Sequence, residues 1–365
     1  MNKNILSAPP VPAVRKGIKE DAGMNGNLTA WELRQLEAKP QSAQARLVNR
    51  LISLLPVLSA LLVLLNYKLV PNKKVMIAFR PYEPTNLYAY FIGVFLVAFT
   101  CMFIISLFSP KFYEKWRSAS PLLTAVFLLL FAYDCATIKL RLLHATYFPA
   151  IDDVLHALVS ERELLWVNFC HSVVLLFTGY LSGAAAGLLC GILGGYFKTA
   201  RYWILPLVRV LGPIPANTWL PVILVLPFIS LFQGAVFMIA LGVWYPVTMT
   251  TMNGVINIPV HNYEVAKTFG VSKWKMLYQI AIPAASPFIF QGLTQGMGIA
   301  CTVLLIAEMM GVEAGVGWYI NWQRGYAEFD KVYAAIIILC LTFFAVNAIL
   351  NAVKKRALRW REDKL

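Results

Sequence analysis

The polar residues whose spacing could serve a chemical role are a few uncharged side chains inside long apolar segments. Gln291, Gln295 and Thr302 stand at positions i, i+4 and i+11, which places them on one face of a helix. Polar side chains in a membrane are costly unless they face protein or water. We therefore predict that this face lines a path for a polar solute; hydrogen bonding between packed helices is the alternative.

The segment 209–230 is a second candidate wall of this path. It contains one amide, Asn217, and four prolines: Pro213, Pro215, Pro221 and Pro227. Each proline removes a backbone donor and disfavours a straight helix. Irregular backbone at membrane depth is tolerated where it is buried or lines a cavity. We therefore expect a broken or kinked helix beside the path.

Two carboxyl groups in the apolar segments allow more than one interpretation. Glu308, near the end of the segment that carries Gln295, is either a gate of the path or a structural anchor. Asp134 is either functional or paired with Lys139 or Arg141. Ionisable residues inside a membrane are candidates for function by default, so both remain candidates.

No arrangement typical of catalysis or metal binding is present in the sequence. The histidines are scattered, the six cysteines form no CxxC pair, and no Ser-His-Asp or Cys-His arrangement emerges. The G-x4-G-K-[ST] motif that cradles nucleotide phosphates is also missing. We predict a chain that is not an enzyme, has no catalytic or metal-binding residues, and binds no cofactor of its own.

The polar loop at residues 255–285 has the pattern of two short helices joined by an elbow. Pro259 favours a helix start, residues 260–269 continue the helix, and Gly270 ends it because glycine adopts the left-handed conformation at low steric cost. Ser272 can cap a second helix, and Pro283 marks the entry of that helix into the next apolar segment. Such an elbow is suited to the cleft of another protein.

The same loop carries a longer pattern. Glu264, Ala266 and Gly270, followed by Ile280 and Pro283, read E-x-A-x3-G-x9-I-x-x-P. This pattern resembles the EAA loop of the permease subunits of ABC importers, in which the loop forms the coupling helix that docks on the ATP-binding subunit. Val265 stands where that family more commonly has its first alanine, which is a small apolar exchange.

Two further stretches resemble one group within that family, the permeases for sulfonate, taurine, nitrate and bicarbonate. Residues 214–221 read IPANTWLP, similar to the I-P-x-x-x-W-L-P segment of the group. Residues 307–311 and 315–320 are similar to its A-E-M-x-G and G-x-G-[YW] segments. The resemblance covers residues 144–360, whereas the first 115 residues, with two additional helices, depart from the usual six-helix plan.

The resemblance implies the fold of a type I ABC importer permease in a bacterial inner membrane. It implies three partners: a separate ATP-binding subunit that binds ATP and Mg²⁺, an extracytoplasmic substrate-binding protein, and a second permease copy in a homodimer. It suggests a small solute such as a sulfonate, taurine, nitrate or bicarbonate, or a vitamin precursor such as a pyrimidine.

Composition by itself predicts a multi-pass membrane protein. Of the 365 residues, 59% are hydrophobic and 14% are charged, whereas soluble domains carry about 25% charged residues. A bilayer span needs about 20 mostly apolar residues, and long apolar runs without alternation exclude a barrel. We predict an all-α polytopic fold with about eight helices, at residues 50–70, 87–109, 119–139, 168–196, 209–230, 234–254, 286–310 and 332–353.

The basic residues predict the orientation of these helices. With both termini in the cytoplasm, 23 of the 32 Lys and Arg residues lie on the cytoplasmic side, as the positive-inside rule requires. The formal net charge of +14 is explained by this topology and does not indicate a nucleic-acid partner.

The predicted elements divide the chain into four parts. A polar cytoplasmic tail spans 1–49 and contains a short helix capped at Thr29 and Glu32. An additional helical hairpin spans 50–118, the permease domain spans 119–353 with its coupling loop at 255–285, and a basic cytoplasmic tail spans 354–365.

The segment 168–196 carries glycines four residues apart, at Gly179, Gly183, Gly187, Gly191 and Gly195. They share one side of a helix and permit close approach of a neighbouring helix. The neighbour belongs either to the same chain or to a second copy.

The main alternative to an ATP-driven importer is a secondary transporter driven by an ion gradient. Such a protein needs ionisable residues inside the membrane, and Asp134 and Glu308 are the ones that qualify. An integral-membrane enzyme would need clustered His, Asp or Glu residues at one membrane face, which the sequence does not show.

Overall fold

The structure is a computed structural model that describes residues 43–72, 76–77, 80–81, 85–310 and 312–359. The predicted helix capped at Thr29 and Glu32 lies outside these residues. The described chain forms two compact units, one within Met1–Leu58 and Phe99–Thr124, the other within Ser59–Ala98 and Ala125–Leu365.

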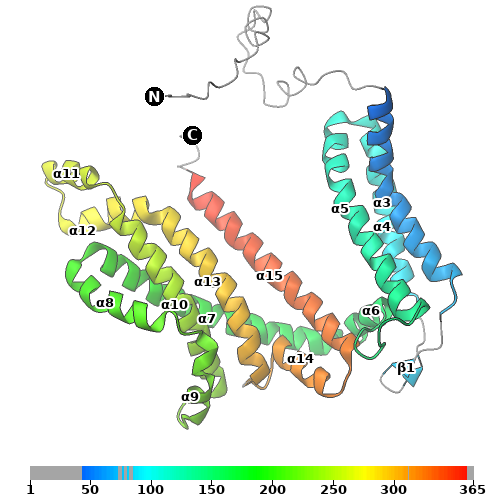
Figure 1. The fold of residues 1–365 in the computed structure, drawn as a ribbon. Helices are drawn as coiled ribbons and strands as arrows, with labels where there is room; N and C mark the ends of the chain where they lie inside the picture. Colours follow the sequence, from blue (N-terminus) through cyan, green and yellow to red (C-terminus); the bar gives the residue numbers. More distant parts are fainter. Residues whose placement is uncertain (1–42, 73–75, 78–79, 82–84, 311, 360–365) are drawn as a thin grey trace, which may run out of the picture. The chain divides into compact units, whose positions relative to one another are not determined.

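The chain begins with three long helices and a small β-ladder (Figure 1). Helix α3 spans Ala43–Leu69, α4 spans Leu87–Phe108, and α5 spans Pro110–Asp134 and continues as a π-helical turn at Cys135–Lys139. Strands β1 (Met76–Ile77) and β2 (Arg80–Pro81) pair antiparallel between α3 and α4.

The remaining elements are helical and belong to the second unit. They are α6 (Ile151–Ser160), α7 (Arg162–Tyr196), α8 (Lys198–Leu211), a 3-10 turn (Ala216–Trp219), α9 (Leu220–Val225), α10 (Leu231–Ile256), α11 (Val260–Thr268), α12 (Lys273–Met276), a π-helical turn (Leu277–Ala281), α13 (Ile282–Met310), α14 (Val316–Gly325) and α15 (Phe329–Ala357).

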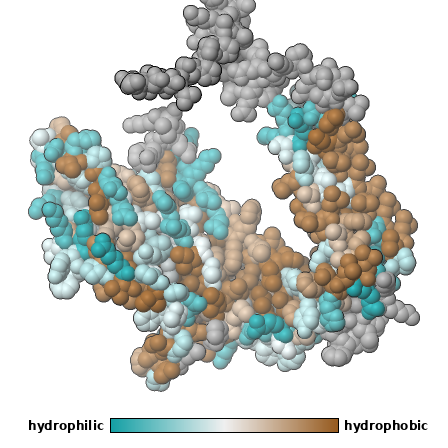
Figure 2. Space-filling model, in the orientation of Figure 1, coloured by the Kyte–Doolittle hydropathy of each residue, from teal (hydrophilic) through white to brown (hydrophobic). Residues whose placement is uncertain are grey.

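Seven helices of the described chain are long and apolar enough to cross a membrane: α3, α4, α5 with its π-turn, α7, α10, α12–α13 and α15. The seven helices agree with the predicted count of about eight, and the segment 209–230 is the predicted span that is not one continuous helix. It consists of the end of α8, the 3-10 turn and the six residues of α9, in agreement with the break that its prolines predict. Figure 2 shows hydrophobic side chains along α3–α5 and hydrophilic ones around α11 and α12.

Helix α5 contributes residues to both compact units, up to Thr124 in the first and from Ala125 in the second. In each unit it contacts neighbouring N-terminal helices. In the first unit the Trp116 indole donates a hydrogen bond to the Ser53 carbonyl, at 2.9 Å, and its ring lies against Phe99. In the second unit Phe95 and Phe127 are in edge contact. The predicted boundary between residues 118 and 119 therefore falls inside a helix, and we treat α3, α4 and α5 together as the N-terminal helices.

The core of the second unit is formed by α7, α10 and α13. Its buried side chains include Leu176 on α7, Met238, Ile239 and Val243 on α10, and Leu304 on α13. Helices α7 and α10 approach each other along the glycine positions of α7. A Cβ atom added at Gly179, Gly187 or Gly191 would come within 2.6–2.8 Å of a side chain of α10, and one added at Gly183 would meet the backbone of Ala240. The close neighbour of the glycines is thus a helix of the same chain.

This packing makes a direct prediction for Gly183→Ala. The added methyl group would clash with the α10 backbone, so we expect the free energy of unfolding to fall by about 1–3 kcal/mol. Gly93 on α4 is the matched control because a Cβ there meets nothing within 4 Å. Gly93→Ala should leave stability unchanged or raise it slightly, by at most about 1 kcal/mol. Denaturant or thermal unfolding of the purified chain in detergent measures both; equal effects would contradict the packing account.

Candidate translocation path and coupling segment

The candidate coupling segment consists of α11, an elbow at Gly270, and α12. Gly270 has φ +69°, and its N–H bonds to the Lys267 carbonyl at 2.9 Å, so the chain reverses in the left-handed conformation that glycine favours. The Ser272 hydroxyl then accepts from the Lys275 amide at 3.5 Å and caps α12. Ala266 is buried, and its carbonyl accepts a hydrogen bond from Val271 N–H across the elbow.

The elbow rests on an aromatic base at the end of α7. The Tyr196 hydroxyl donates to the Lys273 carbonyl at 2.9 Å, and the Tyr196 ring lies against Phe197 and Tyr263. The ring of Phe197 in turn contacts Trp274. Burial, together with the neighbouring Tyr196, raises the pKa of Tyr263, so this phenol stays neutral at physiological pH.

The outer surface of the elbow exposes several large apolar side chains among its polar ones. Phe269 is 81% exposed and Trp274 is 60% exposed, and Val260, Val265 and Tyr278 are also exposed. Glu264 and Pro283 lie at the surface, and Ile280 is half-buried. An exposed aromatic surface on a supported elbow is typical of a protein–protein contact.

The predicted polar face on α13 is present. Gln291, Gln295 and Thr302 are all exposed, while their neighbours Gly296, Met297 and Cys301 are buried. The Thr302 hydroxyl bonds to the Gly298 carbonyl of its own helix, at 3.2 Å. The two amides therefore have their side chains directed away from the core of this chain.

The broken segment lies next to this face of α13. Ala216 is buried in the core with residues of α10 and α13, and the following residue, Asn217, is exposed. A cavity of about 140 Å³ separates the segment from α10 and is lined by Ile214, Ala216 and Ile299 among others. Ile299 is one helical turn from Gln295, so the structure brings Asn217 and the α13 face into one region.

Glu308 does not share the exposed face of α13. It is 1% exposed, and one carboxylate oxygen accepts from the Ser172 hydroxyl at 2.6 Å while the other accepts from Gly317 N–H at 2.8 Å. Ser172 also accepts from Val316 N–H at 2.8 Å. Glu308 and Ser172 thus bind the free amides at the start of α14, which is the role of a structural anchor.

A second α7 residue, Asn168, also binds the backbone at the start of α14. The Asn168 amide oxygen accepts from Gly315 N–H at 2.9 Å, and Gly315 has φ +129°. A Cβ at Gly315 or Gly317 would collide with Glu308. The spacing of the predicted A-E-M and G-x-G stretches therefore brings a carboxylate and two glycines into contact with one another.

Replacing Glu308 with alanine should remove two hydrogen bonds to a buried carboxyl group and leave two donors unpaired. We expect the free energy of unfolding to fall by roughly 3 kcal/mol. Glu313, which is exposed five residues later, is the matched control, and Glu313→Ala should change stability by less than about 0.5 kcal/mol. Thermal unfolding in detergent measures both, and similar stability of the two variants would exclude the anchor.

Asp134 is also hydrogen bonded rather than free. Its carboxylate accepts from the Asn66 side-chain amide at 2.6 Å. The ammonium of Lys139 bonds to the Val70 carbonyl and, at 2.6 Å, to the Asn72 side chain. These contacts join the ends of α3 and α5, so the predicted pairing of Asp134 with Lys139 is replaced by separate polar contacts in one cluster.

The starts of α6 and α15 carry a group of charged residues. Lys331 bridges Glu161 and Glu328 at 2.9 and 2.6 Å. Burial, followed by the negative charges of Asp330 and Asp152, raises the pKa of Asp153 to about 7. Asp153 has a buried carboxylate oxygen without a hydrogen-bond partner in the described chain.

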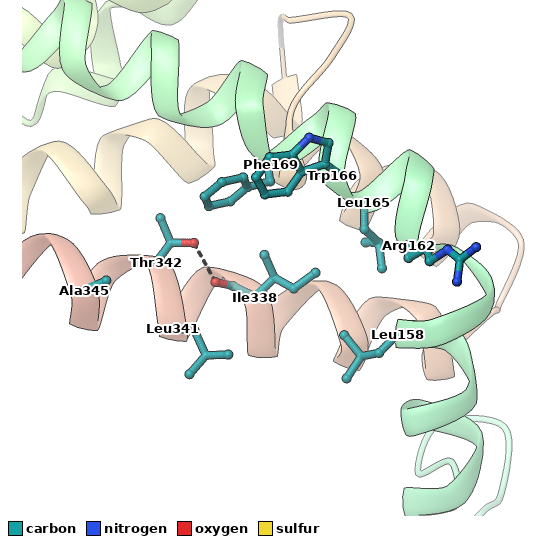
Figure 3. A pocket seen from close by; sticks show the side chains of 9 residues that line it. All are labelled: Leu158, Arg162, Leu165, Trp166, Phe169, Ile338, Leu341, Thr342 and Ala345. Atoms are coloured by element: carbon teal, nitrogen blue, oxygen red, sulfur yellow. Dashed lines mark hydrogen bonds between the residues drawn. The ribbon is translucent and has the colours of Figure 1, made fainter. Parts of the chain in front are cut away.

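A further cavity, of about 410 Å³, lies between α7 and α15 (Figure 3). Its lining is apolar except for Arg162 and Thr342, and the Thr342 hydroxyl bonds to the Ile338 carbonyl of its own helix. The cavity includes none of the predicted path residues, so it is separate from the candidate path.

The described helices and site define a membrane-spanning helical transport component. Residues 183–359 match the family described as "Binding-protein-dependent transport system inner membrane component". The chain belongs to this family, which confirms the predicted class and the all-α permease fold.

Individual relatives agree with this assignment. A putative ABC transporter permease protein of Methanocaldococcus jannaschii is 33% identical over 224 residues, covering 59% of this chain and 80% of the relative. The putative aliphatic sulfonates transport permease protein SsuC of Bacillus subtilis is 31% identical over 190 residues, covering 51% of this chain and 67% of the relative. Among solved structures, an inward facing conformation of the methionine ABC transporter MetNI is 18% identical, covers 54% of this chain and 98% of its own, and has a TM-score of 0.46.

Sequence reasoning missed the partners of Glu308. Asn168 and Ser172 carry no motif of their own, and both lie well over 100 residues from the loop that they bind. The one sequence feature that could have pointed to Asn168 and Ser172 is their spacing, because they are polar residues at i and i+4 of an apolar helix.

Proposed function

We propose that this chain is the permease subunit of an ATP-driven ABC importer, and that it forms the translocation path for a small solute. The observation that carries this proposal is the supported elbow of α11 and α12, with its exposed aromatic side chains, in a chain of the binding-protein-dependent transport family. A separate ATP-binding subunit would dock on the elbow at Glu264–Gly270 and would bind ATP and Mg²⁺. The chain would thus be a transport subunit and not itself an enzyme.

The physical basis of coupling is the firm attachment of the elbow to the membrane helices. Helix α10 leads directly into α11, and α12 continues through a π-helical turn into α13. Leu277 and Ala281 of this turn are buried against Val255 at the end of α10. A displacement of the elbow by an ATPase would therefore be transmitted to α10 and α13, and the latter carries the predicted path residues. The ATPase must contact the elbow differently in the two transport states for this to drive switching.

The remaining components of the proposed assembly follow from the same family. A second copy of the chain would complete the path, and an extracytoplasmic binding protein would deliver the solute. The chain would lie in the cell inner membrane, with both termini and the elbow in the cytoplasm. This topology requires the broken segment 209–230 to cross the membrane in addition to the seven continuous helices. The aliphatic sulfonates named for the relative SsuC support a small sulfonate or similar solute, and relatives named for nitrate, taurine and bicarbonate transport support the same range of small solutes.

The contacts of the two intramembrane carboxyl groups favour this proposal over an ion-driven secondary transporter. Asp134 is bonded to Asn66, and Glu308 is bonded to Ser172 and Gly317. Both groups bind helix ends or neighbouring helices and do not face the exposed side of α13. The ionisable groups that ion coupling would need are thus committed to packing.

Gly270 provides a test of coupling. A Cβ at Gly270 meets nothing within 4 Å, so its replacement acts through the backbone conformation alone. Gly270→Val should cost about 1–2 kcal/mol in the left-handed conformation and should lower transport and transport-linked ATP hydrolysis about tenfold or more. Gly270→Asn is the matched control, because asparagine tolerates this conformation, and it should retain most activity.

The two variants are compared as reconstituted complexes, by solute uptake and ATP hydrolysis in proteoliposomes. Uptake by Gly270→Val at the wild-type rate would contradict the proposed coupling.

Gln295 tests the path. Gln295→Leu removes an exposed amide from α13 and should alter the uptake rate at least severalfold without altering recovery of the assembled complex. Thr294→Val is the control, because the Thr294 hydroxyl bonds to the Phe290 carbonyl of its own helix. Uptake that is unaffected by Gln295→Leu would exclude this residue from the path.

A further inference from the structure

The N-terminal helices stand outside the part of the chain that matches the transport family, which begins at residue 183. Family membership therefore does not explain how the N-terminal helices are attached to the rest of the protein. The contacts at the start of α4 bear directly on this attachment, and all of the residues involved belong to the second compact unit.

Helix α4 begins without a capping carboxylate of its own. Its first turn contains no acidic residue. Asn86, just before the helix, has φ +61°, and its side chain accepts from Lys68 on α3, at 3.2 Å, instead of from the first amides of α4. The free N–H groups at a helix start need an acceptor from elsewhere.

Asp152, on α6, supplies that acceptor from more than 60 residues away. One carboxylate oxygen accepts from Thr85 N–H at 2.5 Å and from the Thr85 hydroxyl at 2.9 Å. The other oxygen accepts from Tyr88 N–H at 2.8 Å. Asp152 and Tyr88 are each 1% exposed, so water does not compete for the bond between them, whereas Thr85 is exposed. A carboxylate at a helix N-terminus also has favourable electrostatics with the helix dipole.

Helix α6 also packs against α15. Val154 and Ala157 of α6 are buried against Ala334 of α15. Glu161, which follows α6, pairs with Lys331 of α15 at 2.9 Å. Helix α6 is thus held on one side by the start of α4 and on another by the last membrane helix.

We propose that the N-terminal helices are fastened to the permease domain by Asp152, which serves as the missing N-terminal cap of α4. Asp152 is a positioning residue in this account. The contact between the Tyr133 hydroxyl and the Pro149 carbonyl, at 2.9 Å, holds α5 beside the same junction. The start of α4 and the end of α5 are consequently held beside α6 within the second compact unit.

The first test is hydrogen exchange of the full-length chain in lipid nanodiscs, followed by mass spectrometry. Asp152→Ala should accelerate exchange of the amides in residues 85–90 by at least about tenfold, because three bonds to a buried carboxylate are lost. Asp152→Asn should give a smaller increase, since the amide oxygen still accepts. Asp153→Ala is the matched control and should change exchange in residues 85–90 by less than twofold, because Asp153 has no bond to α4.

The second test measures attachment directly. A site for a specific protease is introduced at residues 141–144, where Arg141 and Leu142 are exposed, and the folded chain is cleaved after purification through a C-terminal tag. The N-terminal fragment should stay bound in the wild-type background and in Asp153→Ala, and at least tenfold less of it should be retained in Asp152→Ala.

The results separate the possibilities clearly. Unchanged exchange in residues 85–90 and full retention of the fragment in Asp152→Ala would overturn the proposal, as would equal effects of Asp152→Ala and Asp153→Ala. If Asp152→Ala does not fold, Thr85→Ala replaces it. This variant removes the hydroxyl bond from the other side and should raise exchange at residues 85–90 at least twofold; no increase would overturn the proposal.

Discussion

The close contact between α7 and α10 is the constraint on which the rest of the permease domain depends. Glycine every four residues along α7 lets the backbone of α10 approach, and α13 packs against the other side of α10. The three helices share one cluster of buried hydrophobic side chains. Because lipid tails are as apolar as the side chains, this shape complementarity, and not hydrophobic burial alone, must hold helices together in a membrane.

The two ends of the core formed by α7, α10 and α13 make different contacts. At one end, α10 and α13 continue into a short elbow with exposed aromatic side chains and a backbone reversal at Gly270. At the other end, buried carboxyl groups bind the free amides of helix starts. Glu308 binds the start of α14, and Asp152 binds the start of α4. One end thus exposes aromatic side chains, and the other is tied together within the chain.

Much of this arrangement is predictable from local sequence. The left-handed glycine of the elbow, the Ser272 cap, the shared face of Gln291, Gln295 and Thr302, and the break of the segment 209–230 at its prolines all follow from backbone chemistry and helix periodicity. The membrane class follows from composition, and the family from the loop pattern, which the match over residues 183–359 confirms.

Long-range contacts were not predictable in the same way. The spacing of the α7 glycines could not say whether a helix of the same chain or of a second copy packs there. The sequence around Glu308 allowed both a gate and an anchor, because Asn168 and Ser172 are distant in the chain. The segment 209–230 satisfies a hydropathy criterion without forming a continuous helix, because it is rich in proline.

The central claim is that the elbow of α11 and α12 contacts a separate ATPase. The most direct measurement is site-specific photo-crosslinking in native membranes from a benzophenone residue at position 269, with the same residue at position 232 as the control. Phe269 is exposed on the elbow, and Phe232 is exposed at the first turn of α10, at the other end of the core. The account predicts that position 269, and not position 232, crosslinks to a chain with a G-x4-G-K-[ST] motif. Crosslinking of such a chain from position 232 alone, or from neither position in membranes that transport the solute, would contradict it.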